Sequence, residues 1–357
     1  MWIKRLYSKN FRTYSDIDVS FDKGVNVIVG ENGQGKTNLL EAIHFAVTGR
    51  SFKTEKLSDL IQHSKEHLLT HVEYEQSEIS HLIKINYGQD QKKILHDSTI
   101  YPTLSSLTGT VPTISISPCD IELIMGAPLE RRRFLNLLIA QHDPIYLYQL
   151  MRYQKALKAR NILLKRRSTN SIKIYETLLA ESACYLTNAR LKTVLELSSL
   201  IKTEFFELTQ KHLDVTIDYS FKGTASPDYF LEQYNKHRQQ EEKLGTTITG
   251  PHRDDLAFLL LGKDAKQFAS EGQKRALLTA LKLAELKMLK AKTCIDPILF
   301  IDDFAIHLDI YRCKLLESVI QSYPQVFLTT PQNLFDDGSI YFVQDFKVQK
   351  LLSSHRL

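Results

Sequence analysis

The sequence VNVIVGENGQGKTNLLEAIHFAVTG, residues 25–49, carries the strongest structural signal of the chain. Its β-branched beginning, residues 25–29, predicts a strand that is buried on both faces. A glycine-rich turn follows, and apolar residues then recur at helical spacing up to Gly49, which suits a helix C-cap. The order strand, glycine turn, helix predicts an α/β protein whose loop binds phosphate.

The glycine loop GENGQGKT, residues 30–37, matches the pattern G-x-x-x-x-G-K-[ST] at every fixed position. Such a turn points N–H groups at an anion, and the helix N-terminus adds positive partial charge. We expect Lys36 to reach the outer phosphates of ATP in a catalytic role and Thr37 to hold Mg²⁺. The alternative is a glycine turn that binds nothing. The expected nucleotide contacts are Gly30, Glu31, Asn32, Gly33, Gln34, Gly35, Lys36 and Thr37.

The segment PILFIDD, residues 297–303, is an apolar strand that ends in two carboxylates. Beside a phosphate loop, we expect Asp302 to hold the Mg²⁺ ion and Asp303 to orient or deprotonate the attacking water. Taken alone, the same pattern would favour a solvated Asp-Asp turn. The presence of the phosphate loop favours the catalytic interpretation.

A Ser-x-Gly-Gln turn begins the helical pattern SEGQKRALLTALKLAE, residues 270–285. The Ser270 hydroxyl, the Gly272 N–H and the neighbouring Gln273 suit a second anion site at a helix N-terminus. The alternative is an ordinary serine N-cap. With both phosphate elements present, we expect this turn to act as in ABC-type ATPases, with Ser270 in catalysis. ATP then lies between two subunits, so that binding closes a homodimer and hydrolysis releases it.

Composition sets broad limits on the protein class. The chain has 357 residues and a net charge of +5, which permits an anionic partner without requiring one. No run of apolar residues has the length of a signal peptide or membrane span. We therefore expect a cytoplasmic protein with no membrane partner. The cysteines are far apart and form no Cys-x-x-Cys pair, which disfavours a cysteine zinc site and fits a reducing compartment. They are Cys119, Cys184, Cys294 and Cys313.

The pattern of residue types differs between two regions of the chain. Strand-like patterns fill residues 68–95, whereas residues 129–211 are nearly free of glycine and carry long helical periodicities. We therefore expect mixed sheets with helices and an inserted α-helical arm. The expected divisions are an N-terminal part of the ATPase core at 1–125, the arm at 126–235 and a C-terminal part of the core at 236–357.

A basic stripe without Asp or Glu lies within residues 145–175. Such a stripe can bind DNA phosphates without sequence preference. The alternative is a solvated helix face. Its cations are Arg152, Lys155, Lys158, Arg160, Lys165, Arg166, Arg167 and Lys173, interleaved with Tyr146, Tyr148 and Tyr153.

Other basic and histidine residues invite weaker hypotheses. Cations are unfavourable near a helix start, so Arg131, Arg132 and Arg133 suggest either DNA contact or packing against the core. Arg253 is a further candidate, although Asp254 and Asp255 offset its charge. On one helix, His63, His67 and His71 could bind a metal, but strand-like texture begins at once and the hypothesis is set aside.

Four segments, taken together and in order, resemble the RecF family of bacterial recombination-mediator ATPases, relatives of the SMC proteins. They are residues 10–54, SPCDIELIMGAPLERRRFLN at 117–136, TGPHRDDL at 249–256 and the Ser270 helix. The resemblance runs from end to end. It implies an ABC-type P-loop ATPase head with a helical arm in place of a long coiled coil. It also implies ATP-dependent binding to gapped or single/double-strand junction DNA, and cooperation with RecO and RecR in loading RecA.

The sequence departs from the family pattern at two places. Ile306 and His307 stand where the family has Ser and Glu, in a loop that contacts the partner subunit in relatives. Cys119 replaces the usual acidic residue before Asp120. The first departure bears on how dimerisation is coupled to hydrolysis.

Two other classes of protein share parts of this pattern. An ABC-type transport subunit needs a membrane partner, and the basic helical insertion speaks against it. An SMC-like head with another DNA-maintenance role, such as an overcoming-lysogenisation-type nuclease, is the alternative. Those nucleases carry an acidic metal-binding module, and no such separate acidic cluster is present.

Overall fold

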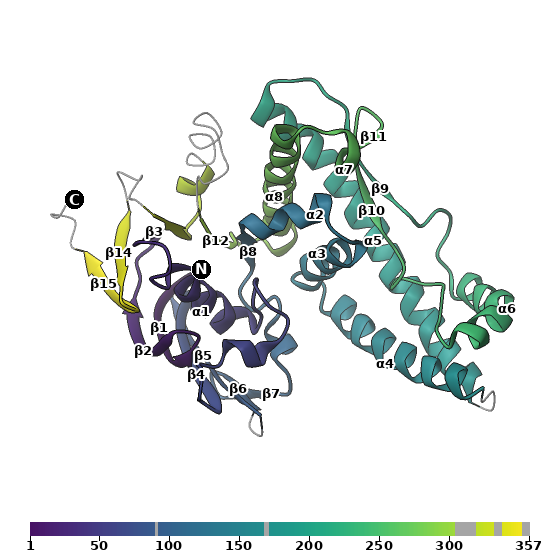
Figure 1. Cartoon of the computed structure of the whole chain (residues 1–357), viewed down its shortest axis with the longest axis horizontal. Coiled ribbons are helices and arrows are strands. Elements are labelled where there is room, and N and C mark those ends of the chain that lie inside the picture. Colours follow the sequence, from purple (N-terminus) through teal and green to yellow (C-terminus); the bar gives the residue numbers. More distant parts are fainter. Residues whose placement is uncertain (90–91, 168–170, 304–318, 332–337, 352–357) are drawn as a thin grey trace. The chain divides into compact units, whose positions relative to one another are not determined.

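The computed structural model describes residues 1–89, 92–167, 171–303, 319–331 and 338–351 (Figure 1). The chain forms two compact units. The first comprises Met1–Asp120 and Leu289–Leu357, and the second comprises Ile121–Met288. Among the helices that lie within these described ranges, none is both long and apolar enough to cross a membrane.

The first sheet of the first unit is antiparallel throughout, in the order β2-β1-β4-β5-β6-β7. Burial along β4 alternates with a period of two, as expected for a strand with one buried face. These strands confirm the strand-like patterns predicted between residues 68 and 95. Their bounds are β1 Trp2–Phe11, β2 Tyr14–Ser20, β4 His67–Gln76, β5 Ile79–Gly88, β6 Lys92–His96 and β7 Thr99–Tyr101.

The second sheet has the order β15-β14-β3-β13-β12-β8, and only the edge strand β15 runs antiparallel to its neighbour. Strands β12 and β13 are buried at every residue, and β3 at all but its first, as their continuous apolar runs predict. The bounds are β3 Gly24–Val29, β8 Thr113–Ile116, β12 Ile298–Ile301, β13 Gln325–Thr330, β14 Ser339–Gln344 and β15 Lys347–Leu351. Parallel order brings the carboxyl ends of β3, β12 and β13 to one edge.

Helix α1, Lys36–Thr48, contacts strands of both sheets and joins them in one core. Its predicted apolar positions Leu39, Leu40, Ile43 and Val47 are fully buried. The helix ends at Gly49, which takes a left-handed conformation with a φ of 67°. Short 3-10 turns lie in the same unit at Leu57–Leu60 and Leu104–Leu107, and another begins the next segment at Pro118–Ile121.

The second unit is mainly helical, as the glycine-poor texture predicts (Figure 1). Asp143 and Ser226 cap α4 and α6, each just before a proline at the first helical position. The helices are α2 Glu122–Met125, α3 Pro128–Ala140, α4 Pro144–Arg166, α5 Ile172–Thr209, α6 Pro227–Leu244, α7 Ala265–Phe268 and α8 Glu271–Thr293. A small antiparallel sheet, β11-β10-β9, accompanies them; its strands are β9 Val215–Tyr219, β10 Leu256–Leu260 and β11 Lys263–Asp264.

The division by packing differs from the one expected from sequence. The expected arm, 126–235, lies within the second unit, but its end falls inside α6. Residues 236–288, assigned above to the ATPase core, also belong to the second unit. Helix α8 crosses the boundary between the units.

Candidate nucleotide-binding site

The glycine loop joins β3 to α1 and is shaped by two of its glycines. A Cβ on Gly30 would lie 2.3 Å from the carbonyl oxygen of Val343, which no side chain could accommodate. Gly35 has a φ of 105°, a conformation that L-residues rarely adopt, and its carbonyl accepts a 2.9 Å bond from the Leu39 N–H. The loop therefore turns tightly into the first turn of the helix, as predicted.

Lys36 is held inside this loop. Its Nζ donates to the carbonyl oxygens of Gly30 at 2.7 Å and Glu31 at 2.9 Å. Burial lowers the pKa of Lys36, whereas the charges of Asp303 and Asp302 oppose that shift. The ammonium is thus bound by the loop backbone and is influenced by the charges of the two carboxylates at the strand end.

Asp302 lies beside Thr37, although 265 positions separate them in sequence. The Asp302 Oδ1 accepts bonds of 2.8 Å from the hydroxyls of Thr37 and Thr329. Burial is the largest cause that raises the pKa of Asp302, while these two hydroxyl bonds lower it. The structure therefore brings together the two residues expected to hold Mg²⁺.

Asp303 has a different environment from its neighbour. Its side chain is only partly buried, and its N–H donates to the Thr329 hydroxyl at 2.7 Å. A φ of 54° turns the chain sharply at this residue. The two adjacent carboxylates are thereby set in different positions at the strand end.

Three residues that contact the site were not predicted from the sequence. The Tyr14 hydroxyl donates to the Gly35 carbonyl at 3.1 Å, and the Gln34 side chain accepts a 2.7 Å bond from the Asp345 N–H. Thr329 bridges both aspartates. Thr329 lies at the end of a strand that pairs with the strand before the two aspartates, and this position could have predicted its contact with them. The sequence around Tyr14 and Asp345 contains no comparable signal.

Ser270 lies in the second unit as the N-cap of α8. Its N–H donates to the Gln273 Oε1 at 2.8 Å, and the Gln273 N–H donates to the Ser270 Oγ at 3.3 Å. This reciprocal pair is a capping box. Ser270 and Gly272 are exposed, and a Cβ on Gly272 would meet nothing within 4 Å. Ser270 therefore caps the helix, and among the described residues no group accepts its hydroxyl proton.

The segment TGPHRDDL, residues 249–256, is fixed by buried polar contacts. Arg190 donates to the Pro251 carbonyl at 2.7 Å and to the Asp254 carboxylate at 2.9 Å. The Tyr153 hydroxyl lies 2.6 Å from the His252 Nδ1. Arg253, an exposed residue, thus lies in a loop whose neighbouring residues are held by these contacts.

Two of the three adjacent arginines expected to contact DNA or the core make contacts with this segment. Arg131 is buried and forms a bidentate pair with Asp255 at 2.7 and 3.1 Å. Arg132 donates to the Asp254 carbonyl at 2.9 Å, and Arg133 pairs with Glu130 on its own helix. Arg131 therefore makes a packing contact, which is the alternative to DNA contact named for these arginines.

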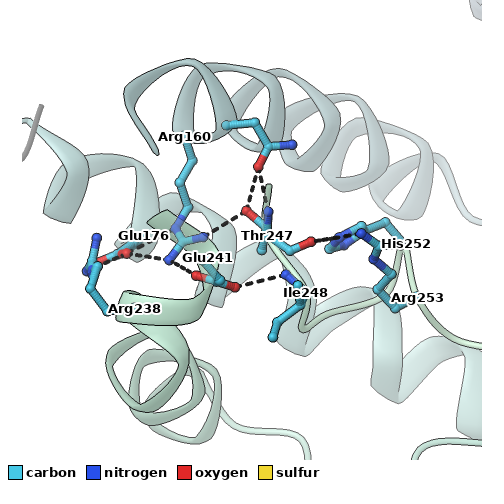
Figure 2. Close-up of polar contacts among 9 residues, drawn as sticks. Arg160, Glu176, Arg238, Glu241, Thr247, Ile248, His252 and Arg253 are labelled. Carbon is cyan, nitrogen blue, oxygen red and sulfur yellow. Dashed lines mark hydrogen bonds and ion pairs between the residues drawn. The ribbon is translucent and has the colours of Figure 1, made fainter. Parts of the chain in front are cut away.

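The expected basic stripe does not form a single exposed face. Arg160 is fully buried and contacts Glu176, Glu241 and Thr247 (Figure 2). Arg152 pairs with Glu181 at 2.6 Å. Tyr146 and Tyr153 are also buried. The exposed cations that remain are Lys155, Lys158, Lys165, Arg166, Arg167 and Lys173.

Two further groups of residues named from the sequence are the histidines considered as metal ligands and the positions at or beside the departures from the family pattern. His67 and His71 lie on strand β4 and His63 precedes it, so no helix presents them together. Asp120 accepts a 2.7 Å bond from the Ser117 N–H and closes a 3-10 turn, in which Cys119 is exposed. Ile306 and His307 lie outside the described residues.

This fold and the loop at its sheet edge define an ABC-type P-loop ATPase head. An Smc head domain from Pyrococcus furiosus has the same fold, with a TM-score of 0.57 at 19% identity over 98% of this chain and 96% of that one. The family described as RecF/RecN/SMC N terminal domain matches residues 2–339. The chain belongs to the RecF family within this class. The DNA replication and repair protein RecF of Protochlamydia amoebophila (strain UWE25) is 38% identical over 344 residues, which cover 94% of this chain and 96% of the relative.

A solved structure agrees with this assignment. The structure of the recombination mediator protein RecF-ATP in the RecFOR pathway has a TM-score of 0.91 and 28% identity, and the match covers 98% of each chain. The similarity therefore extends over the helical second unit as well as the ATPase core.

Proposed function

We propose that this chain is an ATP-dependent DNA-binding protein of replication and recombinational repair, with weak ATPase activity. The observation that carries the proposal is the pairing of Thr37 with Asp302 beside the glycine loop. A hydroxyl and a carboxylate at this position suit a magnesium nucleotide. The names of its relatives, a DNA replication and repair protein and a recombination mediator protein, support the biological setting.

The residues of the loop fit magnesium ATP. Gly30 lies directly against the Val343 backbone, where a Cβ would clash, so the tight path of the loop that presents its N–H groups to phosphate requires glycine. Thr37 and Asp302 supply the hard oxygen donors that Mg²⁺ prefers, and the bound ion would neutralise charge on the phosphates. Lys36 binds the outer phosphates, and Asp303 orients the attacking water or accepts its proton.

Ser270 supports the proposal that ATP joins two copies of the chain. It caps an exposed helix N-terminus, where the free hydroxyl proton and the open Gly272 suit a second contact with phosphate. Ser270, Gly272 and Gln273 of one subunit would then complete the site of the other. ATP binding favours the dimer, and hydrolysis releases it.

The end of the α4–α5 hairpin supports the proposed DNA contact. Lys165, Arg166 and Arg167 are exposed and close together at the end of α4. Within the described parts of the chain, these three side chains form no ion pair. Cations arranged in this way bind phosphates by counterion release. We propose gapped or single/double-strand junction DNA as the substrate, with RecO and RecR as partners in loading RecA.

Binding of fluorescent gapped duplex, measured by anisotropy with ATP, ADP or neither in rising salt, tests this function. We expect ATP to strengthen binding and the triple variant of Lys165, Arg166 and Arg167 to alanine to weaken it at every sequence. The slope of the logarithm of the binding constant against the logarithm of the salt concentration should become shallower by about one unit for each phosphate that the variant no longer neutralises. A triple alanine variant of the exposed Lys65, Lys92 and Lys93 removes the same charge from the other unit and is the control.

Equal reductions of affinity in the two triple variants would contradict the DNA site. Tight binding that depends neither on a gap in the duplex nor on the bound nucleotide would instead favour an SMC-like head with another DNA-maintenance role.

A further inference from the structure

A polar cluster lies on the antiparallel sheet, at the turn between β6 and β7. His81 belongs to β5, His96 is the last residue of β6, and Asp97 follows in the turn. One ligand atom from each lies within 4.8 Å of the others, the single such grouping of three His, Cys, Asp or Glu residues among those described. None of the three takes part in the nucleotide site or in the proposed DNA contact.

The distances within the cluster suit a metal ion. The Asp97 Oδ2 lies 2.9 Å from the His81 Nδ1 and 3.9 Å from the His96 Nε2. Bonds of about 2.1 Å to a tetrahedral zinc ion place neighbouring ligand atoms about 3.4 Å apart, between these two values. The side chains are 25%, 17% and 46% exposed for His81, His96 and Asp97, so an ion can enter from solvent.

Surrounding groups orient two of the ligands. The Leu82 N–H donates to the Asp97 Oδ1 at 2.8 Å, which leaves Oδ2 directed at the histidines. The Tyr101 hydroxyl lies 3.0 Å from the His96 Nδ1, so the opposite ring nitrogen faces the carboxylate. Partners of this kind fix the ring orientation and the tautomer of metal-binding histidines.

We propose that His81, His96 and Asp97 bind a divalent transition-metal ion of the zinc class, with water in the remaining position. Two imidazoles and a carboxylate select zinc-like ions over Mg²⁺, which prefers oxygen ligands. The ion ties the last residue of β6 and the following turn to β5, and so stabilises this side of the sheet.

The competing interpretation is a polar cluster that needs no metal. The Tyr74 hydroxyl lies 2.8 Å from the His96 Nε2, and this bond has to open before an ion can bind there.

Calorimetric titration of the full chain with Zn²⁺ distinguishes the two interpretations. The titration contains no nucleotide, and excess Mg²⁺ saturates sites whose ligands are all oxygen atoms. We expect one equivalent of Zn²⁺ to bind to the wild type and none to bind at this affinity to the double variant His81→Asn/His96→Gln. The control is His67→Asn, an exposed histidine on the same sheet, which should retain the full stoichiometry. Equal binding by the wild type and the double variant would overturn the proposal.

Cobalt spectroscopy tests the site without substitution. Co²⁺ added to the wild type should give the strong visible absorption of a tetrahedral complex, and Zn²⁺ should remove it. Tyr101→Phe should keep the stoichiometry and weaken binding about tenfold, because it removes the partner of the His96 Nδ1. Absence of the Co²⁺ band contradicts the site, and an unchanged affinity in Tyr101→Phe contradicts the positioning role of that residue.

Discussion

At the scale of single residues, the adjacent aspartates 302 and 303 have different surroundings that suit different tasks. The Asp302 carboxylate is buried and accepts two hydroxyl bonds, whereas Asp303 is only partly buried. We predict that Asp303→Asn lowers single-turnover phosphate release by roughly 10²- to 10⁴-fold while ATP still binds, because it removes the proposed general base. Asp302→Asn should instead weaken magnesium-dependent binding. Asp16→Asn, an exposed substitution in the same unit, should change neither quantity.

Phosphate release by Asp303→Asn within a few-fold of the wild type would show that another group activates the water. Parallel measurement of nucleotide binding separates this result from a loss of affinity.

His252 is held in one neutral tautomer. Its Nε2 must donate to the Thr247 carbonyl at 2.9 Å, so its Nδ1 accepts from the Tyr153 hydroxyl. Burial lowers the pKa of His252 from 6.5 to about 4. Between pH 4 and pH 6.5 the His252 imidazole binds a proton in the unfolded chain but not in the folded chain. Its contribution to the free energy of unfolding is therefore full above pH 6.5 and is lost as the pH falls towards 4.

We predict that this histidine removes about 2 kcal/mol from the free energy of unfolding between pH 7 and pH 4.5. Urea unfolding of the wild type and of His252→Asn at both pH values measures the difference. The variant should lose less stability on acidification than the wild type, and the effect of the buried His44 cancels because both proteins contain it. Identical losses would contradict the assigned tautomer.

At the scale of elements, Arg160 joins the helices of the second unit. From α4 it donates to Glu176 of α5 at 2.8 Å and to Glu241 of α6 at 2.6 Å, and all three side chains are buried (Figure 2). Arg160→Met leaves the buried Glu241 without its ion-pair partner and Glu176 with Arg238 as its remaining one, so we predict a loss of about 3–5 kcal/mol in the free energy of unfolding. Lys158→Met, on the exposed face of the same helix, should cost less than about 0.5 kcal/mol.

Urea unfolding monitored by circular dichroism compares these variants. The triple variant Arg160→Met/Glu176→Gln/Glu241→Gln should recover part of the loss, since it removes the unpaired charges as well. Equal stability of Arg160→Met and Lys158→Met would show that the network does not hold the helices together.

The same elements show what sequence can predict. The phosphate loop and the long helices were predictable because their signals are local: a turn between a strand and a helix, and a helical repeat. The burial of Arg160 was not, because Glu241 lies 81 positions away and the stripe itself contains no acidic residue. Arg131 and Asp255 are likewise 124 positions apart, and Thr329 reaches Asp302 only through the pairing of β12 with β13.

At the scale of the whole molecule, sequence texture indicated helix content but not packing. Strands β10 and β11 lie in the range assigned to the ATPase core, yet together with β9 they form a small sheet that belongs to the second unit. The predicted boundary at 235 falls inside α6. The similarity to the RecF-ATP structure covers both units, so the second unit belongs to the shared fold and is not an unrelated insertion.

The central claim is that ATP joins two copies of the chain through Ser270. Light scattering after size exclusion, with ATP, ADP or no nucleotide, tests it most directly. With ATP, the wild type should double in mass, and Ser270→Arg should remain a monomer that still binds ATP. Ser171→Arg, the same substitution at the exposed N-cap of α5, should dimerise like the wild type. A Ser270→Arg protein that doubles in mass with ATP would contradict the account.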